Sequence, residues 1–241
     1  MTKTARSTLA IAALAASLGF GAMLAPPAHA LTWASRDFTC PLDGEKFTAR
    51  VPASWTKFGT RLDLRPIGAL VAPYPVPVCP TTGFPIYKKK FSAQEIAKLK
   101  TIVASPAYRE ARKKNTSYYL VGFLRERMGD SASVTAYAYL QASWQAETKD
   151  PALNRRYLTL TLDRLDRAIA KAKPKSRGWW TMQVLAANLT RRLGRFADAE
   201  KRLERLPLDE LAAKSVYRRL VTQVRGLAAK RDVAPRRFGK S

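Results

Sequence analysis

The chain has 241 residues and a formal net charge of +25, with 43 Lys and Arg residues against 18 Asp and Glu residues. Its one histidine, His29, lies in a segment that we expect to be removed on export. A mature chain without histidine has no imidazole to act as general base or metal ligand, which excludes histidine-dependent triads and most catalytic zinc sites.

Residues 1–30 have the pattern of a secretory signal peptide. Lys3 and Arg6 give a basic start, an apolar run extends from Leu9 to Leu24, and Ala28-His29-Ala30 is a small-residue cleavage site. An uncleaved membrane anchor is the alternative, but the apolar run is short for a bilayer core. We therefore expect cleavage after Ala30 and a periplasmic or secreted protein.

Residues 31–91 are rich in turn and strand signals and predict a small β module. The stretches TCPLDG around Cys40 and VCPTTG around Cys79 each look like half of a zinc knuckle, Cys-Pro-x-Cys-Gly. The second cysteine is replaced by Asp43 in one copy and by Thr82 in the other. A module of this size with few bulky aliphatic residues needs a staple, normally a metal or a disulfide.

Cys40 and Cys79 are the only cysteines, and they occupy corresponding knuckle positions. In a zinc ribbon the first cysteines of the two knuckles come within about 4 Å, sulfur to sulfur, and export leads to an oxidising compartment. We predict a Cys40–Cys79 disulfide in place of the ion, worth about 4 kcal/mol in the chain-entropy model, and no cofactor. The alternative is a metal site of Cys40, Asp43 and Cys79, completed by Thr82 or water.

From residue 92 the periodicity becomes that of helices. Ser92 and Glu95 form a capping box that opens a helix to about Val103. Ser105 and Asp150 are each followed by proline, which is favourable at the first helical position. We expect a helical domain over residues 92–230.

The end of the chain is predicted to consist of one helix and a tail. The last helix is expected to run from about Leu208 to Lys230. Residues 231–241 are basic and contain proline and glycine, so we expect a frayed, disordered tail.

Two helix pairs have the pattern of hairpins. Gly129 and Gly194 follow apolar helical stretches, where glycine ends a helix in the left-handed conformation. Small residues such as Gly122 and Ala199 allow close helix approach. The turn glycines lie 65 residues apart, close to two tetratricopeptide repeats of about 34 residues, although the helix that begins at Pro151 fits this pattern poorly. Helical hairpins of no particular family are the alternative. The predicted fold is therefore mainly α, a tetratricopeptide-like antiparallel array preceded by a small zinc-ribbon-like β module, which is a binding architecture.

Three motifs in order carry a resemblance to a known family. These are residues 40–47 (CPLDGEKF), 61–66 (RLDLRP) and 78–84 (VCPTTGF), followed by a helical region opening near Phe91. The order resembles a bacterial family catalogued as domain of unknown function 2225, over Thr39 to about Ala170. The resemblance implies a zinc ribbon followed by tetratricopeptide-like helices, and no established activity. Asp43 and Thr82 depart from the family's knuckles, so a ribbon without zinc is expected.

Catalytic carboxylates are not favoured by their surroundings. Asp163 and Asp166 share a helix face, but arginines neighbour both, which is typical of a solvated charged face. Asp63 lies between Arg61 and Arg65, where we expect it to fix a turn. The sequence also has no phosphate-binding glycine loop and no nucleophile elbow. We expect a protein that is not an enzyme.

The basic excess suggests a partner instead. We expect an exported interaction module or scaffold of the cell envelope that binds an acidic envelope protein, with no nucleic acid. The alternatives are binding of anionic envelope polymers or lipid headgroups by the basic C-terminal helices, or a degenerate metal-binding protein. The candidate partner-binding residues are Lys171, Lys173, Lys175, Arg177, Lys214, Arg218 and Arg225.

Overall fold

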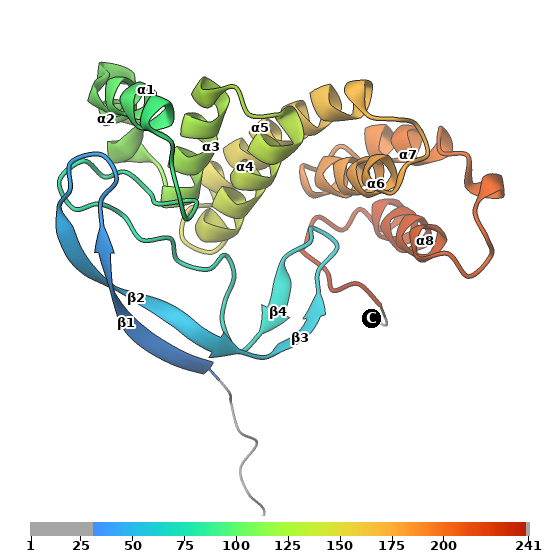
Figure 1. Cartoon of the computed structure of the whole chain (residues 1–241). Helices are drawn as coiled ribbons and strands as arrows, with labels where there is room; N and C mark the ends of the chain where they lie inside the picture. The colour runs from blue at the N-terminus through green and yellow to red at the C-terminus, as the bar shows by residue number, and fades with distance from the viewer. Residues whose placement is uncertain (1–30, 240–241) are drawn as a thin grey trace, which may run out of the picture.

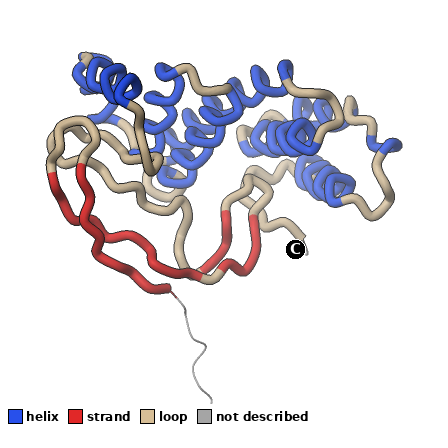
Figure 2. Tube along the Cα trace, in the orientation of Figure 1, coloured by secondary structure: helices blue, strands red, loops and turns tan. Residues whose placement is uncertain are grey.

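The computed structural model describes residues 31–239, so the predicted signal peptide lies outside the described residues. The described chain is mainly α-helical with a small β part at its N-terminal side, as the sequence predicts (Figures 1 and 2). The elements in chain order are β1 (Leu31–Thr39), β2 (Lys46–Trp55), β3 (Lys57–Thr60), β4 (Pro66–Gly68), α1 (Ala93–Ala104), α2 (Pro106–Lys114), α3 (Ser117–Met128), α4 (Ala132–Ala146), α5 (Pro151–Lys171), α6 (Arg177–Arg192), α7 (Phe196–Glu204), the 3₁₀ turn η1 (Leu208–Glu210) and α8 (Val216–Ala229).

The strands form two separate antiparallel hairpins. β1 pairs with β2, with Phe38 opposite Phe47, and β3 pairs with β4. The β1–β2 hairpin runs as a long arm along one side of the molecule, and the β3–β4 hairpin stands near the C-terminal segment (Figure 1). Because isolated two-stranded hairpins are marginal in water, the ends of these hairpins must be held by the rest of the fold.

The first core joins the two cysteine turns to the first helices. Cys40, Cys79 and Phe84 are buried together with Leu99 of α1 and Leu124 of α3. The β module and the start of the helical region thus share one apolar core. This shared burial holds one end of the β1–β2 hairpin against the helices.

The predicted helix starts are present. The Ser92 hydroxyl accepts from the Glu95 amide, and the Glu95 carboxylate accepts from the Ser92 amide. Ser105 and Asp150 cap α2 and α5, each with proline in the first turn. These caps satisfy amides that have no partner inside the helix, which is why α1, α2 and α5 begin at these residues.

The two turn glycines end their helices as predicted. Gly129 and Gly194 have φ of +88° and +81°. The amide after each glycine donates to a carbonyl five residues earlier, from Asp130 to Arg125 and from Arg195 to Thr190. This is the Schellman arrangement, and it turns α3 into α4 and α6 into α7.

Close packing within the first hairpin depends on a missing side chain. A Cβ built on Gly122 in α3 would lie 2.7 Å from the Tyr139 ring of α4. In the second hairpin Ala199 is fully buried. Small residues at these two positions therefore allow the helix approach that the sequence predicts.

The C-terminal region differs from the prediction in two ways. The single helix expected from Leu208 to Lys230 is instead a 3₁₀ turn followed by α8, because Ser215 caps a new helix by accepting from the Tyr217 amide. Residues 231–239 are not frayed. The Phe238 amide donates to the Thr60 carbonyl at 2.9 Å, and the Phe238 ring packs on the core of α6 and α8.

Candidate functional site

The two cysteine turns are joined by the predicted disulfide. Cys40 and Cys79 are bonded to each other, with 5.6 Å between their Cα atoms, and both are buried. The turns share one hydrogen-bond pattern, in which each cysteine carbonyl accepts from the glycine four residues later, Gly44 or Gly83. Both glycines have positive φ, so each turn keeps a knuckle-like shape.

The residues that replace the second knuckle cysteines hold these turns. Asp43 Oδ1 accepts from the Glu45 amide at 3.0 Å, and Thr82 Oγ1 accepts from the Phe84 amide at 3.3 Å. The alternative metal set of Cys40, Asp43 and Cys79 has no free thiolate, because the two sulfurs are bonded to each other. Between residues 31 and 239, no group of three or more His, Cys, Asp and Glu side chains is placed to hold a metal ion.

A buried ionic cluster joins the 61–65 turn to the helices. Arg61 donates to both Asp63 oxygens, at 3.0 and 2.6 Å, and to both Glu147 oxygens, at 2.7 and 2.6 Å. Arg192, at the end of α6, reaches Asp63 at 2.7 Å and Glu147 at 2.8 Å, and Arg65 reaches Glu147 at 2.6 Å. Asp63 fixes its turn as predicted, but it also connects residues 129 positions apart in the chain.

The electrostatics of this cluster favour an ionised Glu147. Burial alone would raise the pKa of Glu147, but the hydrogen bonds and charge of Arg61, together with the charges of Arg192 and Arg65, outweigh burial and hold the pKa below its ordinary value. Sequence reasoning missed Glu147 and Arg192. No local signal marks them, since their partners lie more than 40 residues away.

A second buried arginine anchors the C-terminal segment. Arg191 is fully buried and donates to the Asn188 side chain, to the Asp232 carbonyl and to the Ala234 carbonyl. Burial lowers the pKa of Arg191 to about 10, so the guanidinium is still protonated at neutral pH. The segment beyond α8 is therefore tied to the interior by a charged donor.

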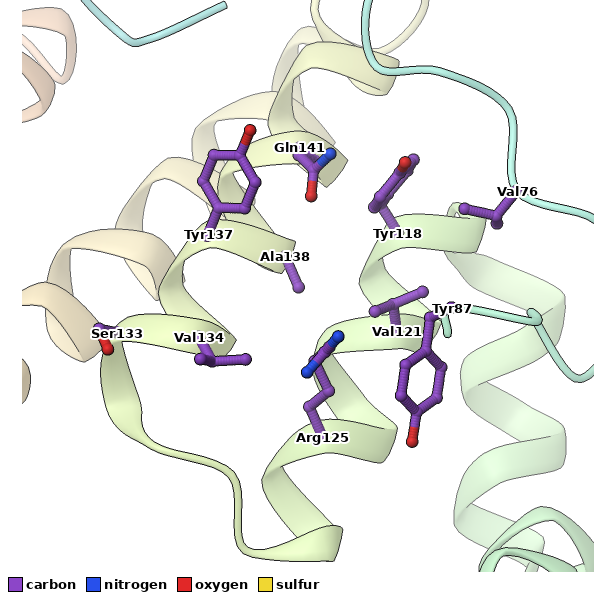
Figure 3. Close-up of a pocket in the computed structure, with 10 residues that line it drawn as sticks. All are labelled: Val76, Tyr87, Tyr118, Val121, Arg125, Ser133, Val134, Tyr137, Ala138 and Gln141. Carbon is purple, nitrogen blue, oxygen red and sulfur yellow. The ribbon is translucent and has the colours of Figure 1, made fainter. Parts of the chain in front are cut away.

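The candidate binding site is a groove of about 380 Å³ between α3, α4 and the loop that precedes α1. Figure 3 shows side chains from both helices and from this loop around one hollow. Val134 and Tyr137 of α4 line it and are 38% and 47% exposed, so both side chains are accessible to a bound partner. The lining residues are Val76, Tyr87, Tyr118, Val121, Arg125, Ser133, Val134, Tyr137, Ala138 and Gln141.

The groove offers hydrogen bonds and apolar surface without an acid or base that titrates near neutrality. Burial raises the pKa of Tyr87 and of Tyr118 to about 12, and it also raises the pKa of Tyr137. The Tyr118 hydroxyl donates to the Tyr74 carbonyl, which holds the loop on α3. All three phenols therefore stay neutral at physiological pH.

Among residues 31–239, Arg125 supplies the one charge in this lining. Its guanidinium lies 4.7 Å from the centroid of the Tyr87 ring and donates to Asp130 at 2.6 Å. Figure 3 shows the guanidinium directed into the hollow between Val134 and Tyr87. Sequence reasoning missed this site, although Val134 and Tyr137 form an i, i+3 pair that could have suggested a second apolar stripe on α4.

The carboxylates considered for catalysis do not form a site together. Asp163 pairs with Arg164 and Arg167, whereas Asp166 accepts two bonds of 2.7 Å from Arg202 of α7. Asp166 thus links α5 to α7. The two carboxylates serve separate ion pairs, as expected for a charged helix face.

The seven predicted partner-binding residues lie in three places. Lys171 ends α5, and Lys173 and Lys175 follow it in the turn before α6, which begins at Arg177. Lys175 pairs with Glu210 at 2.7 Å. Lys214 precedes α8, and Arg218 and Arg225 line one groove together with Arg219.

Within residues 31–239, no helix combines the length and apolar character needed to cross a membrane. A scan of protein-family models, a search of curated proteins and a search of solved structures each found no match to this chain.

Proposed function

We propose that this chain is an exported, non-catalytic interaction module of the cell envelope that binds an extended segment of an acidic partner protein in the α3–α4 groove. The groove itself carries the proposal. It exposes Val134 and Tyr137 beside Arg125, whose guanidinium pairs with Asp130, so it offers apolar contact, a phenol and guanidinium N–H donors to one bound chain. Binding grooves commonly combine an apolar lining with a few polar groups in this way.

The rigidity of the fold supports a binding role. The disulfide braces the two cysteine turns, and the ionic cluster fixes the β module to the ends of α4 and α6. A surface held in one conformation loses less entropy when a partner binds. The expected tetratricopeptide-like character and the resemblance to family 2225 stay predictions; the first agrees with a scaffold, and the second implies no activity.

The charge of the chain supports an acidic partner. A net charge of +25 raises the rate of encounter with acidic proteins and disfavours basic ones. The groove lining contains a guanidinium and neutral phenols and, among residues 31–239, no carboxylate. An enzyme with a neutral-pH acid–base step would need a different set of groups in this groove.

Affinity capture with matched variants tests the proposal. Residues 31–241 are immobilised and exposed to envelope extract, and the retained proteins are identified by mass spectrometry. Val134→Ser combined with Tyr137→Ala removes apolar contact without changing charge, and Val216→Ser on α8 is the control because Val216 is similarly exposed, at 40%.

We expect one acidic protein to be retained by the wild type and by the control, and lost from the groove variant. Retention of that protein by all three forms contradicts the groove as the binding site. If no protein is retained by any form, the interaction role itself is wrong.

A further inference from the structure

A second groove lies along α8. It has a volume of about 720 Å³ and is formed by α8, the stretch before it and the C-terminal segment. Its lining contains three arginines and, in the part of the chain that the structure describes, no acidic side chain. The lining residues are Leu208, Ala213, Arg218, Arg219, Thr222, Gln223, Arg225, Phe238 and Gly239.

The three arginines keep their charges available. None of Arg218, Arg219 and Arg225 forms a salt bridge with a carboxylate among residues 31–239, whereas Arg164 and Arg202 on the other helices do. Arg218 donates through Nε to the Leu211 carbonyl at 2.8 Å. That bond fixes the side chain and uses one of the five N–H donors of the guanidinium, and Arg218 lines the groove.

The C-terminal segment that lines this groove is held against α8. The Gln223 side chain donates to the Arg237 carbonyl at 2.8 Å and accepts from the Gly239 amide at 3.3 Å. The Arg219 guanidinium lies 5.6 Å from the centroid of the Phe238 ring. The C-terminal segment, predicted as a disordered tail, instead forms one side of a preorganised groove.

The chemistry of the walls points to the occupant. Three guanidiniums that have no carboxylate partner among residues 31–239 favour several carboxylates or phosphates, since arginine binds both in a bidentate manner. Leu208 and Phe238 are half-buried against the core, and their remaining exposed parts add apolar surface to the groove. A sugar-phosphate backbone does not match this surface, whereas a peptide with apolar residues between its acidic ones does. We propose that this groove binds an acidic stretch of polypeptide in which carboxylates alternate with apolar side chains.

This proposal rests on the proposed function and gives the acidic partner a second contact. A partner held in the α3–α4 groove by apolar contacts would be held at α8 by charge. Because apolar and charged contacts respond differently to salt, only the contact at α8 should weaken strongly as ionic strength rises.

The test is a direct binding measurement with the full mature chain. A fluorescein-labelled octapeptide in which glutamate alternates with alanine and leucine is titrated by fluorescence anisotropy, beside the same peptide with glutamine for glutamate. Arg219→Gln combined with Arg225→Gln removes two groove charges. Arg155→Gln combined with Lys100→Gln, at exposed positions on α5 and α1, is the control with the same loss of net charge.

We expect the glutamate peptide to bind the wild type and the control with equal affinity. It should bind the Arg219→Gln, Arg225→Gln variant at least about tenfold more weakly. The glutamine peptide should not bind. If both double variants lower the affinity for the glutamate peptide equally, binding depends only on net charge, and the proposed site is wrong. Tighter binding of a labelled polyphosphate of similar length, lost in the groove variant, would overturn the peptide in favour of a phosphate polymer.

The experiments distinguish an error in the α8 proposal from an error in the proposed function. Suppose that the Arg219→Gln, Arg225→Gln variant captures the partner as well as wild type does, while the Val134→Ser, Tyr137→Ala variant does not. The α8 proposal is then wrong and the interaction role stands. If the peptide binds at α8 but no protein is captured by any form, the interaction role is wrong.

Discussion

Replacement of Glu147 by glutamine tests whether the ionic cluster holds the β module to the helices. Glu147 accepts four hydrogen bonds of 2.6 to 2.8 Å from three arginines, and its side chain is only 13% exposed. Glutamine keeps one acceptor oxygen, but its amino group faces guanidinium donors. Arg61, Arg65 and Arg192 are then left with one carboxylate, that of Asp63.

The expected loss follows from the burial of this cluster. Removing one partner from a buried, hydrogen-bonded charge pair costs about 3–5 kcal/mol, because the remaining charge is left without compensation. A protein of this size loses roughly 2–4 °C of Tm for each kcal/mol. We therefore expect Glu147→Gln to lower the Tm by roughly 10 °C.

The pH dependence gives an independent reading. The pKa of Glu147 is lower in the folded state than its ordinary value of 4.5, so the carboxylate contributes stability above that value. This contribution is lost as the pH falls through the folded-state pKa. The difference in unfolding free energy between wild type and Glu147→Gln should therefore be full at pH 7 and shrink as the pH falls below 4.5.

Urea unfolding followed by circular dichroism at several pH values measures both effects. Glu110→Gln is the control, because Glu110 also accepts from two cations, Lys113 and Lys114, but its side chain is 55% exposed. Exposed pairs are screened by solvent, so we expect little change. A Glu147→Gln variant as stable as the Glu110→Gln variant at pH 7 would show that the cluster does not hold the fold together.

Three further predictions concern stability. Reduction of the disulfide should destabilise the chain by about 4 kcal/mol in the chain-entropy model, which would be measured as a lower Tm in the presence of reductant. Two alkylated thiols in the exported protein without reductant would refute the pairing. Gly122→Ala should lower the free energy of unfolding in urea by about 1–3 kcal/mol, because the added Cβ would meet the Tyr139 ring. An unchanged urea midpoint would contradict this packing. Deleting residues 231–241 should lower the free energy of unfolding by about 3–5 kcal/mol, because the buried Arg191 loses both its carbonyl acceptors and its ion pair with Asp232. A deletion without effect on the urea midpoint would mean that the segment is not anchored.

The sequence by itself determined the features that depend on neighbouring residues. Helix starts at Ser92 and Asp150 follow from caps that bond within three residues, and the stops at Gly129 and Gly194 follow from a conformation that glycine adopts without steric cost. The disulfide was predictable because only two cysteines exist.

Tertiary structure decided the features that join distant segments. Asp63 pairs with Arg192 across 129 positions, and no periodicity or local motif specifies such a partner. The same holds for the segment beyond α8. Its basic and proline-containing composition resembles that of a disordered tail, but its carbonyls accept hydrogen bonds from the buried Arg191, which order it. Local hydrogen bonds are encoded by residues a few positions apart, whereas the pairing of buried charges depends on which surfaces the packed core brings together.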